Sequence, residues 1–313
     1  MPPEKLSRPF QASSGYAWQT LLESIHEAVY LVNRGLNIEF ANEASELLTG
    51  FSSSEVMGKP CHKNFLIQQD AHVFDLCIKN CPVELTYTDG IVRKHKAYLR
   101  HKDGFLFPVD LRIIPYNDSR GNTVSVLEAF LDDSPRILVP QKTEELKRTN
   151  LLDPLISQGN RRYLEMHLHS RLEEKKKIGM SFGVLYMYVD DIHTLFDKYG
   201  SVIKDRIFQT ISLTLSNNIR FFEVLGRWEE DEFVVVLLHI DEVHLELVAN
   251  KLRLLVEQST IRTKDILLKP TVSVGATLAH THDTLEILIN RAKKLADQSK
   301  KLGKNRVSLT FKD

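Results

Sequence analysis

The sequence is poor in cysteine and has no excess of charge of either sign. Three cysteines in 313 residues do not make the dense, even-numbered set of a secreted disulfide framework. Forty-one basic residues match forty-one acidic residues, so no overall field attracts nucleic acid or an anionic membrane. No apolar run approaches the roughly 20 residues that cross a bilayer, and residues 1–15 lack a hydrophobic signal core. We therefore expect a cytoplasmic protein with no membrane and no nucleic-acid partner.

The length and the 42% hydrophobic content predict two globular domains. In the first, AVYLVN and NIEFAN read as short strands around the turn at Gly35, and EASELLTG and SSSEVMG read as helices. After a less regular middle come three strand-like runs, KHKAYLRHKDG, FLFPVDLRIIPYND and NTVSVLEAFLDD. This order predicts a compact antiparallel α+β unit.

Several phrases of this half together resemble a PAS sensor domain over residues 16–133. They are EAVYLVNRGLNIEFANEASELLTGFSSSEVMGK, HKDGFLFPVDLRIIP and LEAFLDD. The resemblance implies an antiparallel sheet with flanking helices that serves as a sensing or dimerising input. Residues 1–15 then form a flexible tail, and residues 134–152, with Pro140 at a possible helix start, form a linker helix that pairs with its twin in a homodimer.

From residue 153 to 313 helical and strand patterns alternate, which predicts a mixed α/β sheet covered by helices. The phrases NRRYL, VLGRW, DEFVVVLL, TVSVGAT and KKLGKNRV occur in this order. Their order and spacing resemble a GGDEF domain, the nucleotidyl-cyclase-like module of diguanylate cyclases. The resemblance implies a reaction that joins two GTP molecules into cyclic di-GMP with the help of Mg²⁺.

The segment RWEEDEFVVVLL contains the hairpin turn that aligns with the GGDEF signature. Asp231 and Glu232 retain the two acids, whereas Glu229 and Glu230 replace both glycines. Tight hairpin turns favour residues that tolerate positive φ, and a non-glycine residue there costs roughly 1–2 kcal/mol. A carboxylate charge at ~4 Å from a phosphate charge also repels it by about 4 kcal/mol at an effective dielectric constant near 20. We therefore predict that the turn has a strained backbone and disfavours the binding of a nucleotide.

Other nucleotide positions that the resemblance implies are also altered. Tyr188 replaces the principal metal-binding acid, and Asp190 retains the second acid of that motif. His193 replaces a phosphate-contacting lysine and Phe196 replaces the guanine-reading asparagine, while Asp205 keeps the second guanine contact. The loss of a metal ligand and a base contact makes cyclase activity unexpected.

Two further pairs of residues match the family. Lys300 and Lys304 stand at the positions of phosphate-binding basic residues, on a basic C-terminal helix that we interpret as a solvated face. Arg220 and Glu223 match the R-x-x-D motif of the family's product-inhibition site, with Glu in place of Asp. They predict either cyclic di-GMP binding or a surface ion pair, and the ion pair is favoured.

The cysteines of the first domain allow two interpretations. Cys61, His62, Cys77 and Cys81 could hold zinc or an iron–sulfur cluster, because thiolates select such metals. Cysteine also serves as a small buried hydrophobic residue. Three cysteines leave a four-ligand metal site incomplete, and the nearest histidine, His62, is badly placed because it is adjacent to Cys61. The core interpretation is therefore favoured.

Three functions remain open from the sequence. The first is a signalling protein whose degenerate cyclase domain acts through dimerisation, contact with an unknown signalling protein, or residual binding of GTP or cyclic di-GMP. The second is an active diguanylate cyclase with atypical site residues. The third is a metal or redox sensor that uses the cysteines.

Overall fold

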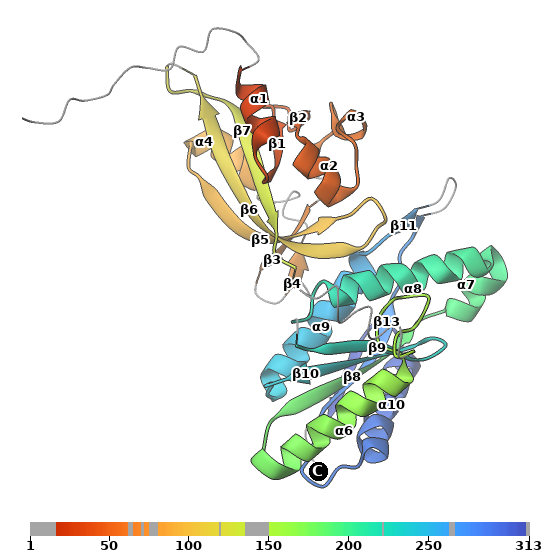
Figure 1. The fold of residues 1–313 in the computed structure, drawn as a ribbon. Helices are drawn as coiled ribbons and strands as arrows, with labels where there is room; N and C mark the ends of the chain where they lie inside the picture. Colours follow the sequence, from red (N-terminus) through yellow and green to blue (C-terminus); the bar gives the residue numbers. More distant parts are fainter. Residues whose placement is uncertain are drawn as a thin grey trace, which may run out of the picture. The chain divides into compact units, whose positions relative to one another are not determined.

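The computed structural model describes residues 17–61, 65–69, 72–74, 81–118, 120–134, 150–220, 222–262 and 267–310. Two large sheets, one in each half of the chain, contain most of the strands among these residues (Figure 1). The expected flexible tail and most of the expected linker helix lie outside the described residues. The domain boundaries at residues 16, 134 and 153 remain predictions.

The N-terminal sheet has the strand order β2-β1-β7-β6-β5-β3-β4. The register of the paired strands β1–β2, β1–β7, β3–β4 and β3–β5 is antiparallel, so the predicted α+β architecture is confirmed. The strands are β1 Ala28–Val32, β2 Ile38–Ala41, β3 Phe65–Gln69, β4 His72–Phe74, β5 Arg93–Arg100, β6 Leu106–Asn117 and β7 Thr123–Asp132. The helices are α1 Ala17–Ser24, α2 Glu43–Thr49, α3 Ser53–Val56 and α4 Pro82–Asp89.

The sequence did not indicate β3, β4 or α4, which occupy the less regular middle. The two strands are short. The helix α4 begins with Pro82 at its first position and ends at Gly90, which has a left-handed backbone, an arrangement typical of helix ends.

A buried asparagine connects the first elements of this sheet. Asn42 caps α2 by accepting from the amide of Ser45 at 3.0 Å, and it also accepts from the amide of Val29 in β1 at 3.0 Å. Its own amide donates to the carbonyls of Leu22 and Glu27. One side chain therefore satisfies backbone groups of α1, β1 and α2 and of the segment between α1 and β1, as a buried polar group requires.

The C-terminal sheet has the order β14-β13-β8-β10-β9. The β13–β14 pair is parallel and the other pairs are antiparallel, so the predicted mixed sheet is confirmed. The strands are β8 Phe182–Val189, β9 Val224–Glu229, β10 Glu232–Leu238, β13 Val272–Leu278 and β14 Val307–Thr310, and a separate pair comprises β11 Ile261–Arg262 and β12 Leu267–Leu268. The helices are α6 Arg161–Ile178, α7 Ile192–Tyr199, α8 Ser201–Ser216, α9 Glu242–Gln258 and α10 Leu285–Lys301. Of these elements, the sequence did not indicate α7, β11 or β12.

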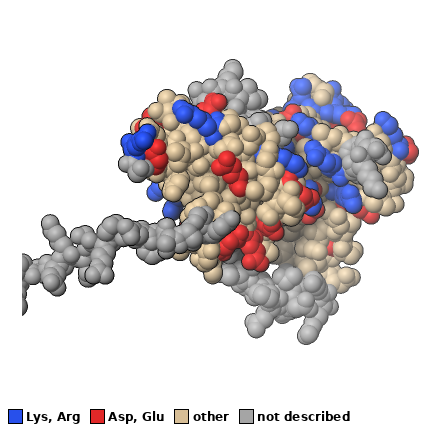
Figure 2. All heavy atoms as spheres, turned by 90° about the horizontal axis from the view of Figure 1, so that it is seen from above, with Lys and Arg blue, Asp and Glu red and all other residues tan. Residues whose placement is uncertain are grey.

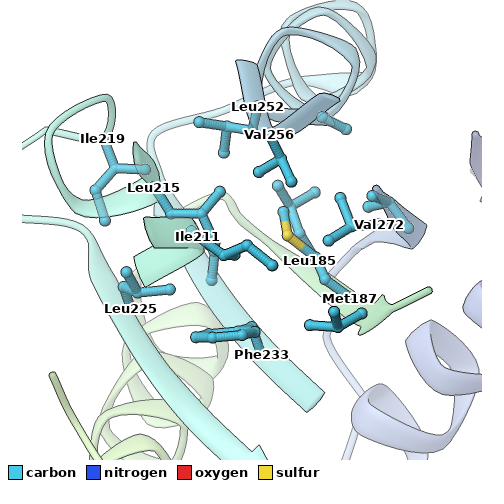
Figure 3. Close-up of a cluster of buried hydrophobic side chains, with 14 of the residues drawn as sticks. Leu185, Met187, Ile211, Leu215, Ile219, Leu225, Phe233, Leu252, Val256 and Val272 are labelled. Atoms are coloured by element: carbon cyan, nitrogen blue, oxygen red, sulfur yellow. The ribbon is translucent and has the colours of Figure 1, made fainter. Parts of the chain in front are cut away.

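The central strand β8 is buried on both faces, and its alternation decides where each side chain points. Leu185 and Met187 pack into one cluster, which Figure 3 shows together with residues of α8 and α9 such as Ile211, Leu215, Leu252 and Val256. Tyr186 and Tyr188 belong to the opposite cluster, with leucines of α6 and small residues of α10. The two tyrosines therefore face α10.

A glycine allows α10 to lie directly on the sheet. A Cβ atom at Gly275 in β13 would lie 2.0 Å from the carbonyl oxygen of Ala292 in α10. Any side chain at this position would push the helix away. The close approach brings the long side chains of α10 within reach of the strand ends.

Charged side chains of both signs are interspersed over the face shown in Figure 2, without a continuous field of one sign. This agrees with the balanced composition. Among the helices of the described ranges, none combines the length and the apolar character of a membrane span.

Candidate functional site

The end of β8 and the β9–β10 hairpin lie side by side in the C-terminal sheet. Tyr188 is paired with Glu232 in the β8–β10 register, and the amide of Val189 donates to the carbonyl of Asp231 at 3.0 Å. The fold therefore brings together the positions that the resemblance assigned to metal binding.

The turn at Glu230 and Asp231 reverses the chain without left-handed backbone. Non-glycine residues with positive φ occur elsewhere in the described chain, at Leu36, Asn150, Ser157, Asp191, His239, Lys304 and Asn305. The prediction of backbone strain at Glu229 and Glu230 is therefore wrong. The pairing register shifts between Glu232 and Phe233, and such a bulge adds a residue that lets ordinary backbone complete the turn.

Glu229, at the first glycine position, forms an ion pair with Arg161, the first residue of α6. The amide of Arg227 donates to the carbonyl of Gly159 at 2.8 Å, which holds the residues before α6 against β9. Nη1 of Arg161 then lies 3.0 Å from Oε1 of Glu229, and its guanidinium carbon lies 4.7 Å from the centre of the Trp228 ring. The Glu229 charge is thus countered by the protein itself.

Glu230, at the second glycine position, is exposed and is held through its backbone. Its carbonyl accepts from Nε and Nη2 of Arg227 at 3.1 and 2.6 Å. Arg227 also lies 3.4 Å from Asp153. The exposed Glu230 carboxylate adds negative charge to the surface of the turn.

Glu232 is 4% exposed and both of its oxygens are engaged. The hydroxyl of Tyr186 donates to Oε2 in a short hydrogen bond, and Nζ of Lys293 lies 2.8 Å from Oε1. A buried carboxylate needs such partners. Lys293 is the cation that neutralises it.

A second lysine of α10 covers Tyr188. Nζ of Lys300 lies 4.0 Å from the centre of the Tyr188 ring, in the range of cation–π attraction. Burial first, and the carboxylates of Glu232 and Asp297 next, hold the pKa of Tyr188 above its usual value of 10.0. Burial and the hydrogen bond to Glu232 raise the pKa of Tyr186 as well, so both phenols remain protonated near neutral pH.

Asp190 serves the internal structure of the sheet. It is 3% exposed, and its oxygens accept from Ser273 at 2.7 Å, Thr271 at 2.8 Å and the amide of Asn305 at 3.1 Å. These contacts join β8 to β13 and to the loop before β14. The retained acid is therefore turned inward, away from a ligand in solvent.

The candidate phosphate residue His193 and the candidate base-binding residues Phe196 and Asp205 lie on α7 and α8 and are exposed. His193 and Asp205 face solvent, and Phe196 is 42% exposed. Nζ of Lys204 lies 5.3 Å from the centre of the Phe196 ring. The surface at the guanine position thus carries an aromatic ring with a cation over it.

The second candidate phosphate-binding lysine is paired. Lys304 makes a short ion pair with Asp191, the residue that precedes α7. This contact raises the pKa of Lys304 above its usual value. Lys300 covers Tyr188, so both lysines have protein partners.

The donors at the strand ends do not fit a Mg²⁺ site, which requires several oxygen ligands in an octahedron. Tyr188 offers a neutral phenol, and the oxygens of Glu232 and Asp190 already accept other bonds. In the ranges that the structure covers, no cluster of three or more histidine, cysteine, aspartate or glutamate residues could hold a metal ion. Asp231 by itself does not make a site.

Sequence reasoning missed Tyr186 and Lys293 as site residues. The interpretation of the basic C-terminal helix as a solvated face is wrong for Lys293, which binds Glu232, and for Arg291, whose guanidinium binds Asp283 at 2.9 and 2.6 Å. A signal did exist, because Lys293 and Lys300 are seven residues apart on α10 and seven residues correspond to about two helical turns. Two lysines on one face point to a shared target.

Arg220 and Glu223 lie in the turn before β9. Oε2 of Glu223 accepts from the backbone amide of Arg220 at 2.7 Å, and the Arg220 guanidinium lies 5.9 Å from the ring of Phe222. The predicted ion pair between the two side chains is not among their contacts in the structure, because the glutamate binds the backbone instead. Phe221 lies outside the described residues.

The cysteine interpretation is tested only in part. Cys61 and Cys81 are buried, and burial raises the pKa of the Cys61 thiol. Such a thiol is a poor nucleophile. Cys77 and His62 lie outside the described residues, so their role as ligands stays a prediction.

Comparison with known proteins agrees with this arrangement. Residues 150–306 match the family described as "Diguanylate cyclase, GGDEF domain", and residues 26–134 match a PAS domain family. The chain is 28% identical to diguanylate cyclase DosC of Escherichia coli K12 over 55% of this chain and 38% of the relative. It is also 28% identical to response regulator PleD of Caulobacter vibrioides over 61% of this chain and 47% of the relative. The chain thus spans less than half the length of these two relatives.

Solved structures show the same fold in the C-terminal half. Diguanylate cyclase SiaD of Pseudomonas aeruginosa, crystallised with its activator SiaC, is 25% identical with a TM-score of 0.52, covering 54% of this chain and 65% of SiaD. The coiled coil and GGDEF domain of DgcB of Caulobacter crescentus, in complex with c-di-GMP, is 17% identical with a TM-score of 0.51, covering 54% of this chain and 91% of that chain. Since the family match spans half of the chain, the protein belongs to the GGDEF family of diguanylate cyclase domains and carries a PAS domain before it.

Proposed function

We propose that this PAS–GGDEF protein is a cytoplasmic signalling protein whose GGDEF domain does not synthesise cyclic di-GMP. The PAS domain receives the input. The GGDEF domain transmits it through homodimerisation, contact with a signalling partner, or residual binding of GTP or cyclic di-GMP.

The engagement of Glu232 carries this proposal. Phosphoryl transfer between nucleotides depends on divalent cations that carboxylates hold near the reacting phosphates. Here Lys293 and Tyr186 occupy both oxygens of the buried acid, and Tyr188 offers no carboxylate. A fixed ammonium group cannot bridge phosphate oxygens and protein ligands as a metal ion does.

The exposed side of the turn supports the same proposal. Glu230 adds negative charge where a triphosphate would approach, and Phe196 lacks the polar group that reads a guanine edge. An unpaired donor or acceptor on a bound base costs about 1–3 kcal/mol. Nucleotide binding in the catalytic pose is therefore disfavoured at the metal, the phosphates and the base.

The relatives support the choice of output. SiaD was crystallised with a protein activator, and DgcB was crystallised with c-di-GMP. A GGDEF domain of this kind thus has two possible targets, a protein or cyclic di-GMP, that do not require catalysis. Arg220 is the candidate residue for cyclic di-GMP here.

A direct assay tests the proposal. The full chain is incubated with GTP and either Mg²⁺ or Mn²⁺, and the products are separated by chromatography. No cyclic di-GMP above the level of a Glu232→Ala control is expected. Product that exceeds this control would establish the alternative, an active cyclase with atypical residues.

Calorimetry separates the remaining outputs. GTP and cyclic di-GMP are titrated side by side into the wild type and into Arg220→Ala. Binding of cyclic di-GMP that Arg220→Ala abolishes would identify ligand binding as the output. The absence of both heats, together with a dimer mass in light scattering, would favour protein contact.

Elemental analysis and an absorbance spectrum of anaerobic protein test the third possibility, a metal or redox sensor. Retained zinc, or the absorbance of an iron–sulfur cluster, would support it.

A further inference from the structure

The PAS sheet contains a buried acid that neither the fold nor the proposed output uses. Glu128 lies in β7 and is 3% exposed. In the β1–β7 register it is the cross-strand partner of Tyr30, which is 1% exposed. Cross-strand partners project from the same face of a sheet, so the carboxyl and the phenol enter the same part of the core.

Each of these two side chains has a buried polar atom without a hydrogen bond. They are Oε2 of Glu128 and the hydroxyl oxygen of Tyr30. The nearby hydroxyl of Thr49 donates to the carbonyl of Ser45 at 2.7 Å and so does not donate to Tyr30. Native proteins leave few buried polar atoms unpaired, and two such atoms on paired residues indicate a site with a function.

None of the titratable groups that we identify around Glu128 is a cation. Tyr30 faces it from β1, and the buried thiols of Cys61 and Cys81, the latter at the start of α4, interact with it electrostatically. The charge of Glu46 in α2 also acts on Tyr30. Among the residues that the structure describes, no lysine, arginine or histidine forms an ion pair or hydrogen bond with Glu128.

Charged side chains on the neighbouring elements point elsewhere. Arg112 of β6 and Glu84 of α4 are exposed. Arg93, after α4, binds Asp89 at the end of that helix. The acid therefore has no counter-charge from β1, β6, α2 or α4.

We propose that Glu128 is a proton-binding site in the PAS core: its carboxyl carries a proton in the resting state, and loss of this proton changes the packing of β1 against β7. The proton passes to solvent and leaves a carboxylate in an apolar core. Because no cation is at hand, the carboxylate must draw in water or move outward. The input of the protein would then be alkalinisation.

The electrostatics agree with this assignment. Burial first, and the Cys81 thiol next, raise the pKa of Glu128 from 4.5 to about 8. A value in this range places the change of charge within the pH interval that cells experience.

The raised pKa of Glu128 determines whether the protein becomes more or less stable as pH rises. Between pH 4.5 and about 8 the folded protein holds the Glu128 proton and the unfolded chain does not. Stability therefore falls as pH rises, by about tenfold in the folding constant per pH unit. The effect is absent below the unfolded pKa and levels off above the folded pKa.

Infrared difference spectroscopy of the full chain tests the proposal without a variant. A protonated carboxyl band is expected at about pH 6, where ordinary acids are ionised, and this band should disappear as the solution is titrated through about pH 8. Glu128→Gln should lack the band, and the exposed control Glu84→Gln should retain it. A wild-type spectrum without a protonated carboxyl at about pH 6 would overturn the proposal.

Denaturation as a function of pH provides the second measurement. The ratio of the folding constants of wild type and Glu128→Gln should fall by about tenfold per unit over this interval. The ratio of wild type to Glu84→Gln should stay constant. A constant ratio for Glu128→Gln as well would show that the acid does not titrate with the core, and would contradict the proposal even if the infrared band were present.

Discussion

Nζ of Lys293 lies 2.8 Å from Oε1 of Glu232, the last acid of the EEDEF turn. The two residues are 61 positions apart in the sequence, and the side chain of Glu232 is 5% exposed while that of Lys293 is 35% exposed. The ammonium group thus reaches from the edge of α10 to a carboxylate inside the sheet. It provides the positive charge that the buried acid needs.

Lys293→Met should destabilise the GGDEF domain. Methionine keeps most of the apolar stem but leaves the Glu232 carboxylate with a single partner, Tyr186. A loss of about 2 kcal/mol in the free energy of unfolding is expected, because a buried acceptor or charge that loses its partner costs this much or more. Urea denaturation measures it. The adjacent exposed Lys294→Met serves as the control, and equal stability of the two variants would contradict the prediction.

Tyr188→Asp should restore metal binding only when Lys293 is also replaced. In the single variant Lys293 still neutralises Glu232, so the new carboxylate gains little. The double variant Tyr188→Asp/Lys293→Met frees both acids, and we expect Mn²⁺ to bind at least about tenfold more tightly, or 1.4 kcal/mol. Calorimetry with Mn²⁺ on wild type, both single variants and the double variant measures the difference. Tight binding by wild type would show that the ammonium does not exclude the ion.

Arg161→Ala should cost more than Glu229→Gln. The ion pair between these residues is about half exposed on each side, so its loss is worth at most about 0.5 kcal/mol. Arg161 also binds Glu165 at 2.9 Å and covers the Trp228 ring, so its removal should cost about 1 kcal/mol and shift tryptophan fluorescence. Should Glu229→Gln prove the more damaging change, the turn would depend on charge compensation rather than on stacking.

Asp283→Asn should reduce the extent to which the GGDEF domain loses stability as pH falls. Burial tends to raise the pKa of Asp283, but the hydrogen bonds from Arg291 and the amide of His280 outweigh it and hold the pKa below 3.8. An acid with a lowered folded pKa contributes stability above its unfolded pKa and loses it as pH falls. Wild type should therefore exceed Asp283→Asn in stability at neutral pH, and the gap should narrow below pH 3.8. Thermal melts at a series of pH values measure this, and a gap that does not vary with pH would contradict it.

The sequence alone indicated the order of most elements and both families. The short apolar runs AVYLVN and SFGVLYMYV identify strands from local pattern, whereas the helix caps at Asn160 and Thr284 were seen only in the structure. The altered positions Tyr188, Phe196, Glu229 and Glu230 were also readable, since a substitution within a motif needs no coordinates. Short elements such as β3, β4 and α7 were missed because a few residues carry too little periodicity.

Tertiary structure decided which partners these residues have. The EEDEF turn has no left-handed backbone, and the strand register there, with Trp228 as the extra residue opposite Glu232 and Phe233, is set by strand pairing and not by residue type. The pairing of Lys293 with Glu232 depends on α10 lying against the sheet at Gly275, and the burial of Glu128 beside Tyr30 depends on the β1–β7 register. Local pattern reports the direction of a side chain relative to its own strand or helix. The charge it meets is fixed only when elements far apart in the sequence pack together.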